Sequence, residues 1–147
     1  MIEACTHIEQ PGWLRLRSAL WPHCPDSKHL AEMHSFLAAP ERFAQYVFDS
    51  APKVAVGFVG AALRYDYVPG TNSSPVAFLE GIYVVPAARR QGIATRLVAE
   101  LAEWARDCGC TDLASDTQLA NAASQSVHKA LGFSEAERIV CFAQSLR

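Results

Sequence analysis

The spacing of apolar side chains divides the chain into segments typical of strands and of helices. The strongest helical pattern begins at Ile93 and stops at Gly109, where a residue without a side chain favours the end of a helix. Polar side chains fill the intervening positions, so the pattern predicts an amphipathic helix over 93–108. Its apolar face consists of Ile93, Leu97, Leu101, Trp104, Ala105 and Cys108.

Three further helices are expected from the same spacing. One begins at Pro11 and buries Trp13, Leu16 and Leu20, and prolines between 21 and 26 interrupt it. The next is capped by Asp26 or Ser27 and ends before Pro40. The last runs from Ala122 to Leu131, between Asn121 and Gly132.

Runs rich in β-branched and aromatic residues predict the strands. The longest two, 54–67 and 76–85, flank a loop of Pro, Gly, Asn and Ser, which is typical of an antiparallel hairpin. Four shorter strands are expected at 2–8, 43–49, 112–116 and 134–144. A strand, the helix 93–108 and another strand in succession favour a right-handed crossover between parallel strands. We therefore expect one α/β (α+β) domain over residues 1–147, with a mixed, mostly antiparallel sheet, one parallel strand pair and about four helices.

Composition narrows the class of protein. Half of the 147 residues are hydrophobic, 19% are charged and the net charge is -2, as in soluble globular domains. No basic stripe indicates nucleic acid, no apolar run has the length of a membrane span, and residues 1–10 do not resemble a signal peptide. We expect a cytoplasmic protein that binds neither nucleic acid nor membrane.

The cysteines predict neither disulfides nor a metal site. Their number, five, is odd and their spacing irregular, so we expect reduced, buried thiols. Cys108 and Cys110 form the one close pair, but a second pair at zinc-like spacing is missing.

Candidate chemistry lies where the strand ending at Val85 meets the strongest helix. Pro86 ends the strand, a loop carrying Arg89 and Arg90 follows, and Gly92 precedes the helix. The N-terminus of a helix offers unpaired N–H groups and a partial positive charge, and glycine lets an anion approach them. This order of strand, basic loop and helix favours a diphosphate site over a surface loop with solvated arginines.

These residues resemble a known signature. The segment Arg89-Arg90-Gln91-Gly92-Ile93-Ala94 is similar to the Arg/Gln-x-x-Gly-x-Gly/Ala motif of the GNAT acetyltransferases. Asn121 and Leu131-Gly132-Phe133 resemble the second conserved segment of that superfamily. Similarity to one branch, the aminoglycoside 6'-N-acetyltransferases, extends almost end to end, through segments 20–22, 64–68, 74–76, 78–82, 114–117 and 135–138.

The resemblance implies an enzyme that transfers acetyl directly from acetyl-CoA to the 6'-amino group of kanamycin- or tobramycin-type antibiotics, conferring resistance without a metal. It also implies that two sheet strands splay apart and that the cofactor arm pairs with the strand backbone there. A polar contact to that arm from Asn121 is implied too, and this residue can also cap the helix from Ala122, a role compatible with the contact. The implied cofactor contacts are Ile82, Tyr83, Val84, Arg90, Gln91, Gly92, Ile93, Ala94, Thr95 and Asn121.

An aminoglycoside is a polycation, so its site requires carboxylates and aromatic faces. Either Glu80 or Asp116 would receive the proton of the acceptor ammonium, directly or through water. Cys24 stands where similar enzymes carry a histidine, so His23 substitutes for it or the contact is lost. The positions that the resemblance assigns to acceptor binding are Trp21, Cys24, Tyr67, Glu80, Asp116 and Glu137.

Three questions stay open at this point. His128 occupies the position of a tyrosine that protonates the departing thiolate in many relatives, and it is either a proton donor or a packed histidine. The acceptor could be another amine, or the chain could be a non-catalytic sensor of CoA. The resemblance implies a homodimer, in which the apolar run 139–142 either pairs across the interface or forms an internal strand.

Overall fold

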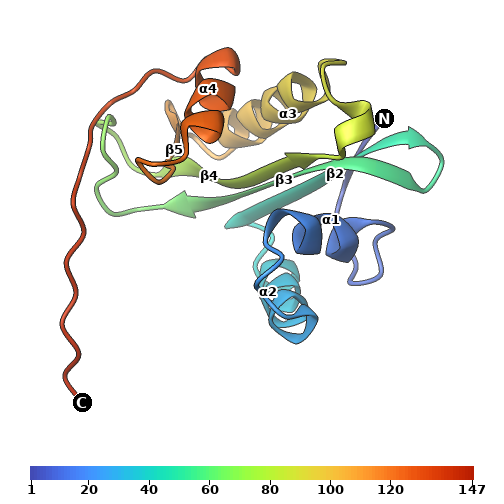
Figure 1. Ribbon diagram of the computed structural model, residues 1–147, viewed down its shortest axis with the longest axis horizontal. Coiled ribbons are helices and arrows are strands. Elements are labelled where there is room, and N and C mark those ends of the chain that lie inside the picture. Colours follow the sequence, from blue (N-terminus) through green and yellow to red (C-terminus); the bar gives the residue numbers. More distant parts are fainter.

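A five-stranded sheet forms the centre of the computed structural model, which describes residues 1–147 (Figure 1). The strands lie in chain order, and every neighbouring pair is antiparallel except the last, β4–β5. They are β1 (Ile2–Ala4), β2 (Phe43–Ala51), β3 (Val54–Arg64), β4 (Val76–Val84) and β5 (Leu113–Ser115). The predicted hairpin and the parallel crossover are thereby confirmed.

Helices cover both faces of the sheet (Figure 1). On one face lie α1 (Trp13–Leu20) and α2 (Asp26–Ala38). On the other lie α3 (Ile93–Asp107) and α4 (Ala122–Ala130). A short 3₁₀ turn, η1 (Pro86–Ala88), joins β4 to the loop before α3.

The alternation of side chains along the strands divides the core into two layers. Val47 and Phe58 face α1 and α2, where they pack with Trp13 and Met33. Their chain neighbours Phe48 and Val59 face α3 and join the second layer, which is centred on Ile93, Leu97 and Leu101. The apolar stripe predicted over 93–108 is therefore the surface with which α3 covers the sheet.

β4 has two irregularities that shape the candidate site described below. Gly81 pairs with Gly60 and Leu79 pairs with Ala61, so Glu80 is an extra residue in a β-bulge. The pairing of β4 with β5 ends at Leu79 and Ser115, which leaves the edge of β4 from Glu80 onward without a neighbouring strand. We call the point where β4 and β5 part, at Leu79 and Ser115, the fork.

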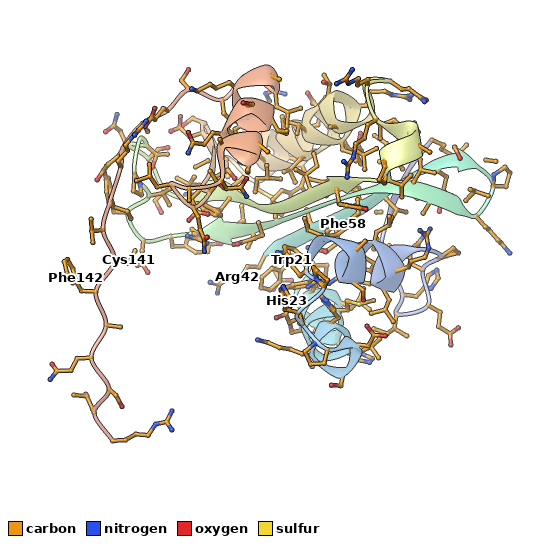
Figure 2. The ribbon with its side chains drawn as sticks, in the orientation of Figure 1. Trp21, His23, Arg42, Phe58, Cys141 and Phe142 are labelled. Atoms are coloured by element: carbon orange, nitrogen blue, oxygen red, sulfur yellow. The ribbon has the colours of Figure 1, made fainter.

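The strand predicted at 134–144 is wrong. After α4 the chain continues as an extended tail without secondary structure, residues 134–147, that leaves the body of the molecule (Figures 1 and 2). Phe142 is 91% exposed there. The apolar run 139–142 suits a strand, but a strand needs an edge to pair with, and this segment makes no pairing within the chain.

Two local predictions also need correction. The strand from Ile2 ends at Ala4, because residues 7–9 form a turn, and the strand from Val54 ends at Arg64, which leaves Tyr67 in a loop. All five thiols are free as expected, but only Cys5 and Cys110 are buried, and Cys141 is exposed in the tail. Burial raises the pKa of the Cys5 thiol far above its ordinary value.

Candidate active site

The basic loop before α3 presents a continuous row of free donors. None of the six backbone N–H groups from Arg90 to Thr95 has a partner within the chain. No side chain caps the helix and no acidic residue lies in its first turn. Gly92 adopts a left-handed φ of 78°, and a Cβ there would meet nothing within 4 Å, so the approach to these donors is open. The geometry fits an anion such as a diphosphate.

The arginines of this loop have different roles. The side chain of Arg89 is held by the fold, since its Nε donates to the Val84 carbonyl at 2.8 Å and its guanidinium lies over the Tyr83 ring. Arg90 is exposed, makes no ion pair and has a left-handed φ of 63°, which is unusual for a residue with a side chain. Arg90 therefore provides the free positive charge beside the donors.

The free edge of β4 runs from this loop back to the fork. Ile82, Tyr83 and Val84 pair with β3 on one side only. In an antiparallel pair, alternate residues direct their backbone groups away from the partner strand, so this edge offers donors and acceptors to an extended ligand. The three predicted backbone contacts thus lie along one open edge.

A pocket of about 730 Å³ lies between the sheet and the helices α1 and α2. Trp21, Cys24 and Glu80, three of the six predicted acceptor residues, line it, and His23 lies beside them. Figure 2 shows Trp21 and His23 on the α1–α2 side of the sheet, near Phe58 of β3. The pocket therefore reaches the bulge of β4, where Glu80 stands at the fork.

Close packing fixes Trp21 against β4. A Cβ on Gly81 would lie 2.5 Å from two carbons of the Trp21 ring, so only glycine leaves room for it there. Phe58 contacts the same ring edge-on, at 6.3 Å between centroids. The Trp21 ring, which lines the pocket, therefore lies against Gly81, the residue after the bulge.

A buried arginine packs against the Trp21 ring. Arg17 is 3% exposed, its guanidinium lies 4.9 Å from the centre of the Trp21 ring, and it donates to Glu32 at 2.6 Å. Burial lowers the pKa of Arg17, and the Glu32 carboxylate opposes this effect. Gln45 accepts from both Trp13 and Arg17. The pocket thus rests on a polar network that links α1, α2 and β2.

Sequence reasoning missed this network. A charged residue in a helix is usually solvated, so Arg17 was not expected inside. The available signal was its position four residues after Trp13 and four before Trp21, on the buried face of α1. The missed pocket residues with polar side chains are Arg17, Lys28, His29, Glu32 and Gln45.

The catalytic carboxylates predicted from the sequence occupy different environments. Glu80 is 42% exposed at the pocket and pairs with Arg64 at 3.1 Å, so it has the partner that a carboxylate in an apolar strand requires. Asp116 is exposed directly after β5 and does not line the pocket. The pocket therefore contains Glu80 but not Asp116.

The other predicted acceptor residues lie near the start of the tail. Tyr67 is 74% exposed in the loop between β3 and β4. Gly70 of that loop approaches Ala136 closely enough that a Cβ on Gly70 would lie 2.5 Å from the Ala136 Cβ. Glu137 is the next residue, so the loop and the tail place Tyr67 and Glu137 in one region, outside the pocket.

Asn121 and His128 have defined partners on α4. Asn121 caps the helix, because its Oδ1 accepts from the Ser124 N–H at 3.0 Å, and this confirms the expected helix cap. His128 is bonded to its own helix through Nδ1 and the Ser124 carbonyl, at 2.7 Å. Its other nitrogen, Nε2, lies 2.9 Å from Ser115 Oγ at the fork.

Comparison with known proteins identifies the class. Residues 3–133 match the family model described as "Acetyltransferase (GNAT) family". A Serratia marcescens protein named aminoglycoside N(6')-acetyltransferase type 1 is 51% identical over 146 residues, which cover 99% of each chain. A Salmonella enteritidis protein of the same name is 46% identical over 93% of this chain and 92% of its own. The chain belongs to the GNAT acetyltransferase family.

Solved structures agree with this assignment. The apo aminoglycoside 6'-N-acetyltransferase AAC(6')-IG from Acinetobacter haemolyticus superposes with a TM-score of 0.93 at 39% identity, covering 100% of this chain and 99% of the other. The structure of AAC(6')-Iy contains a bisubstrate analog, CoA-S-monomethyl-acetylneamine. It superposes with a TM-score of 0.89 at 42% identity, covering 99% of this chain and 97% of that one.

Two further observations concern metal-binding clusters and membrane-spanning helices. The structure gathers no three His, Cys, Asp or Glu side chains in an arrangement that could hold a metal ion. No helix combines the length and the apolar character that crossing a membrane would require.

Proposed function

We propose that this chain transfers the acetyl group of acetyl-CoA to the 6'-amino group of aminoglycosides of the kanamycin and tobramycin type, and so confers resistance to them. The observation that carries the proposal is a continuous route. Six free N–H groups before α3 lead into the open edge of β4, and that edge ends at the bulge that borders the pocket. Relatives with the aminoglycoside name and near-complete coverage support the choice of acceptor.

Each part of acetyl-CoA has a matching element in this route. The amides from Arg90 to Thr95 and the Arg90 charge would hold the diphosphate. The backbone of Ile82, Tyr83 and Val84 would pair with the pantetheine arm as an additional strand. Asn121 would reach the same arm through atoms that its capping bond leaves free. The thioester then arrives at the fork, about 17 Å of strand from Val84 to Leu79 by the rise per residue.

The acceptor side combines aromatic and acidic groups. Trp21 would stack on a sugar ring, Cys24 would contact it, and the carboxylates Glu80, Asp116 and Glu137 would bind ammonium groups, with Tyr67 beside them. Glu80 or Asp116, directly or through water, would take a proton from the acceptor ammonium to make the amine nucleophilic. A free backbone N–H of the β4 edge beside the fork would stabilise the oxyanion.

The remaining expectations are part of the same proposal. We propose that residues 1–147 act as one domain, in the cytoplasm, as a homodimer. Support for the dimer comes from the tail, whose apolar side chains Ile139, Val140 and Phe142 are 62%, 77% and 91% exposed. An exposed extended segment of this kind has the unpaired backbone groups that a second copy would satisfy.

The test is release of thiol from acetyl-CoA by the purified protein with kanamycin, tobramycin or spermidine as the acceptor. We expect release with the two aminoglycosides, and mass spectrometry with NMR of the product should locate the acetyl group on the 6'-nitrogen. Bacteria that express the chain should tolerate higher concentrations of both antibiotics. Release with spermidine alone would assign another amine as the acceptor, and binding of CoA without release would indicate a sensor.

The two candidate bases are tested by Glu80→Gln and Asp116→Asn. Loss of the base that deprotonates the amine should lower kcat on the order of 100-fold at neutral pH, with a smaller loss at high pH, where free amine is abundant. Unchanged kcat and KM in both variants would remove both assignments.

A further inference from the structure

Ser115 and His128 form a chain of hydrogen bonds that closes the fork. Ser115 Oγ lies 3.0 Å from the Leu79 carbonyl oxygen and 2.9 Å from His128 Nε2. His128 Nδ1 lies 2.7 Å from the Ser124 carbonyl oxygen. The chain therefore joins the last paired residues of β4 and β5 to α4.

The number of hydrogens on Ser115 and His128 determines how many of these bonds can form at the same time. Both ends are carbonyl oxygens, which can only accept, so Nδ1 donates to Ser124 and the single Ser115 hydrogen donates to Leu79. The Ser115 oxygen then remains an acceptor, and His128 Nε2 must carry a hydrogen to donate to it. All three bonds are made together only when the imidazole carries both of its protons.

Loss of one proton changes a single contact. With Nε2 deprotonated, the Ser115 hydrogen turns from Leu79 to His128, and only the Leu79 carbonyl loses its partner. The Nδ1 bond to Ser124 keeps the ring in place in both states. The Phe133 ring also contacts the imidazole edge-on, at 5.5 Å between centroids, and covers one side of it. The chain can thus give up a proton through the Ser115 hydroxyl without moving the backbone.

We propose that Ser115 protonates the departing CoA sulfur and that His128 supplies the proton through it. This inference rests on the proposed function, which brings the thioester to the fork along the edge of β4. Ser115 is the catalytic residue, because its hydroxyl would touch the sulfur, and His128 is a positioning residue that acts through it.

Two proton transfers accompany the departure of CoA. The carbon–sulfur bond of the tetrahedral intermediate breaks and its electron pair goes to sulfur. The Ser115 proton moves to that sulfur, and the Nε2 proton of the imidazolium moves to Ser115 Oγ. The products are CoA thiol, an intact serine and a neutral His128 that still donates from Nδ1, and solvent returns one proton to His128 before the next turnover.

Four variants separate proton donation from simple support of the fork. Ser115→Ala removes the donor, and Ser115→Thr keeps a hydroxyl at the same position. His128→Gln keeps an amide that can donate a hydrogen bond to Ser115 but cannot give up a proton. The fourth is the double variant Ser115→Ala/His128→Gln. The matched control for loss of a hydroxyl is Ser73→Ala. Ser73 is exposed, and its hydroxyl forms a hydrogen bond with that of Thr111, which is distant in the sequence.

We expect kcat to fall on the order of 100-fold in Ser115→Ala, in His128→Gln and, without further loss, in the double variant. KM for acetyl-CoA and for the acceptor should stay within about twofold, since no binding contact is removed. Ser115→Thr should keep most of the activity, and Ser73→Ala should behave as the unmodified chain.

Full activity in His128→Gln would overturn the relay, because an amide satisfies a structural role but not proton transfer. Losses that multiply in the double variant, or a raised KM for acetyl-CoA in place of a lowered kcat, would overturn it too. Each rate is measured with whichever amine the unmodified chain acetylates. Failure with aminoglycosides alone therefore contradicts the proposed acceptor and leaves the relay measurable, whereas no thiol release with any amine would overturn both.

Discussion

An alanine at position 81 would place its Cβ 2.5 Å from two Trp21 ring carbons and 2.7 Å from a Leu20 methyl carbon. The backbone of β4 is held by pairing with β3, so the aromatic ring has to move. We expect Gly81→Ala to raise KM for aminoglycosides about tenfold and to lower Tm, by analogy with other overpacked sites, which lose about 1–3 kcal/mol.

The double variant Gly81→Ala/Trp21→Leu tests whether the effect passes through the ring. A smaller side chain at position 21 should relieve the overlap, so the second change should recover Tm while acceptor binding stays weak. Steady-state kinetics and thermal unfolding measure the two quantities. A Gly81→Ala protein with normal KM and Tm would show that Trp21 is not held as described.

Asp49 is the residue at which pH should alter stability. It is 6% exposed, and its Oδ1 has no hydrogen-bond partner. Burial raises the pKa of its carboxyl, Glu3 adds to the rise, and the N-terminal ammonium group opposes it. The folded chain therefore holds this proton more tightly than the unfolded chain does, so the contribution of Asp49 to stability is greatest at low pH and is lost as pH rises through the folded pKa.

We accordingly expect Asp49→Asn to raise Tm at pH 7, because the variant has no buried charge to desolvate. The gain should shrink as pH falls through the raised pKa of Asp49 in the folded chain, because the aspartic acid itself then becomes neutral. Thermal unfolding by circular dichroism between pH 4 and 8 gives the comparison, and Glu9→Gln, at an exposed carboxylate, is the control. A gain that did not change with pH would contradict the assignment to desolvation.

At the scale of elements, the loop before α3 stores backbone strain at the ligand site. Arg90 has a φ of 63° without being glycine, which costs about 1–2 kcal/mol. We expect Arg90→Gly to keep or raise Tm, because glycine adopts this φ readily, and to weaken CoA binding about tenfold through the lost charge. Calorimetric titration should therefore show a lower affinity for CoA, whereas thermal unfolding should show an equal or higher Tm.

Arg106→Gly, in the last turn of α3, is a comparison for loss of charge away from the loop. It should lower Tm, since glycine destabilises a helix, and leave CoA affinity unchanged. Equal CoA affinity in Arg90→Gly and the unmodified chain would contradict a role for this charge in binding.

Elements encoded by neighbouring residues could be predicted from the sequence, and elements that depend on distant partners could not. The stripe of α3 and the cap of α4 at Asn121 are local signals, and both were confirmed. The bulge at Glu80 arises from the register between β3 and β4, and no local sequence pattern predicts it. Likewise, the apolar run 139–142 indicates a strand but does not specify which edge it pairs with.

The site follows the same division. The half that we propose to bind an anion is one continuous segment, Arg90 to Thr95, so residue order alone indicated it. The pocket that we propose for the acceptor assembles residues from α1, the following loop, α2 and β4. Sequence reasoning predicted Trp21, Cys24 and Glu80, which line this pocket, but not Arg17 and Glu32. Burial of Arg17 depends on three aromatic rings from separate elements, which only the folded chain brings together.

At the scale of the whole molecule, the tail carries the most exposed large apolar side chains, Phe142 at 91% and Leu146 at 93%. Residues 134–147 form no helix and pair with no strand of the sheet, so the rest of the domain should fold without them. We expect the full chain to sediment as a dimer and a chain ending at Phe133 to sediment as a monomer. Removal of the tail also removes Glu137, so KM for aminoglycosides should rise, whereas CoA affinity should persist because the loop from Arg90 to Thr95 is intact.

A point variant distinguishes the interface from the carboxylate. Val140→Asp places a charge in the apolar run, where it should disrupt pairing with a second copy, and it leaves Glu137 in the chain. Glu137→Gln has the reverse design and should keep the dimer. If Val140→Asp is a monomer with the weak acceptor binding of the shortened chain, the dimer itself positions Glu137. If it is a monomer with normal acceptor binding, Glu137 acts within its own chain, and a full-length monomer of the unmodified protein would contradict the dimer altogether.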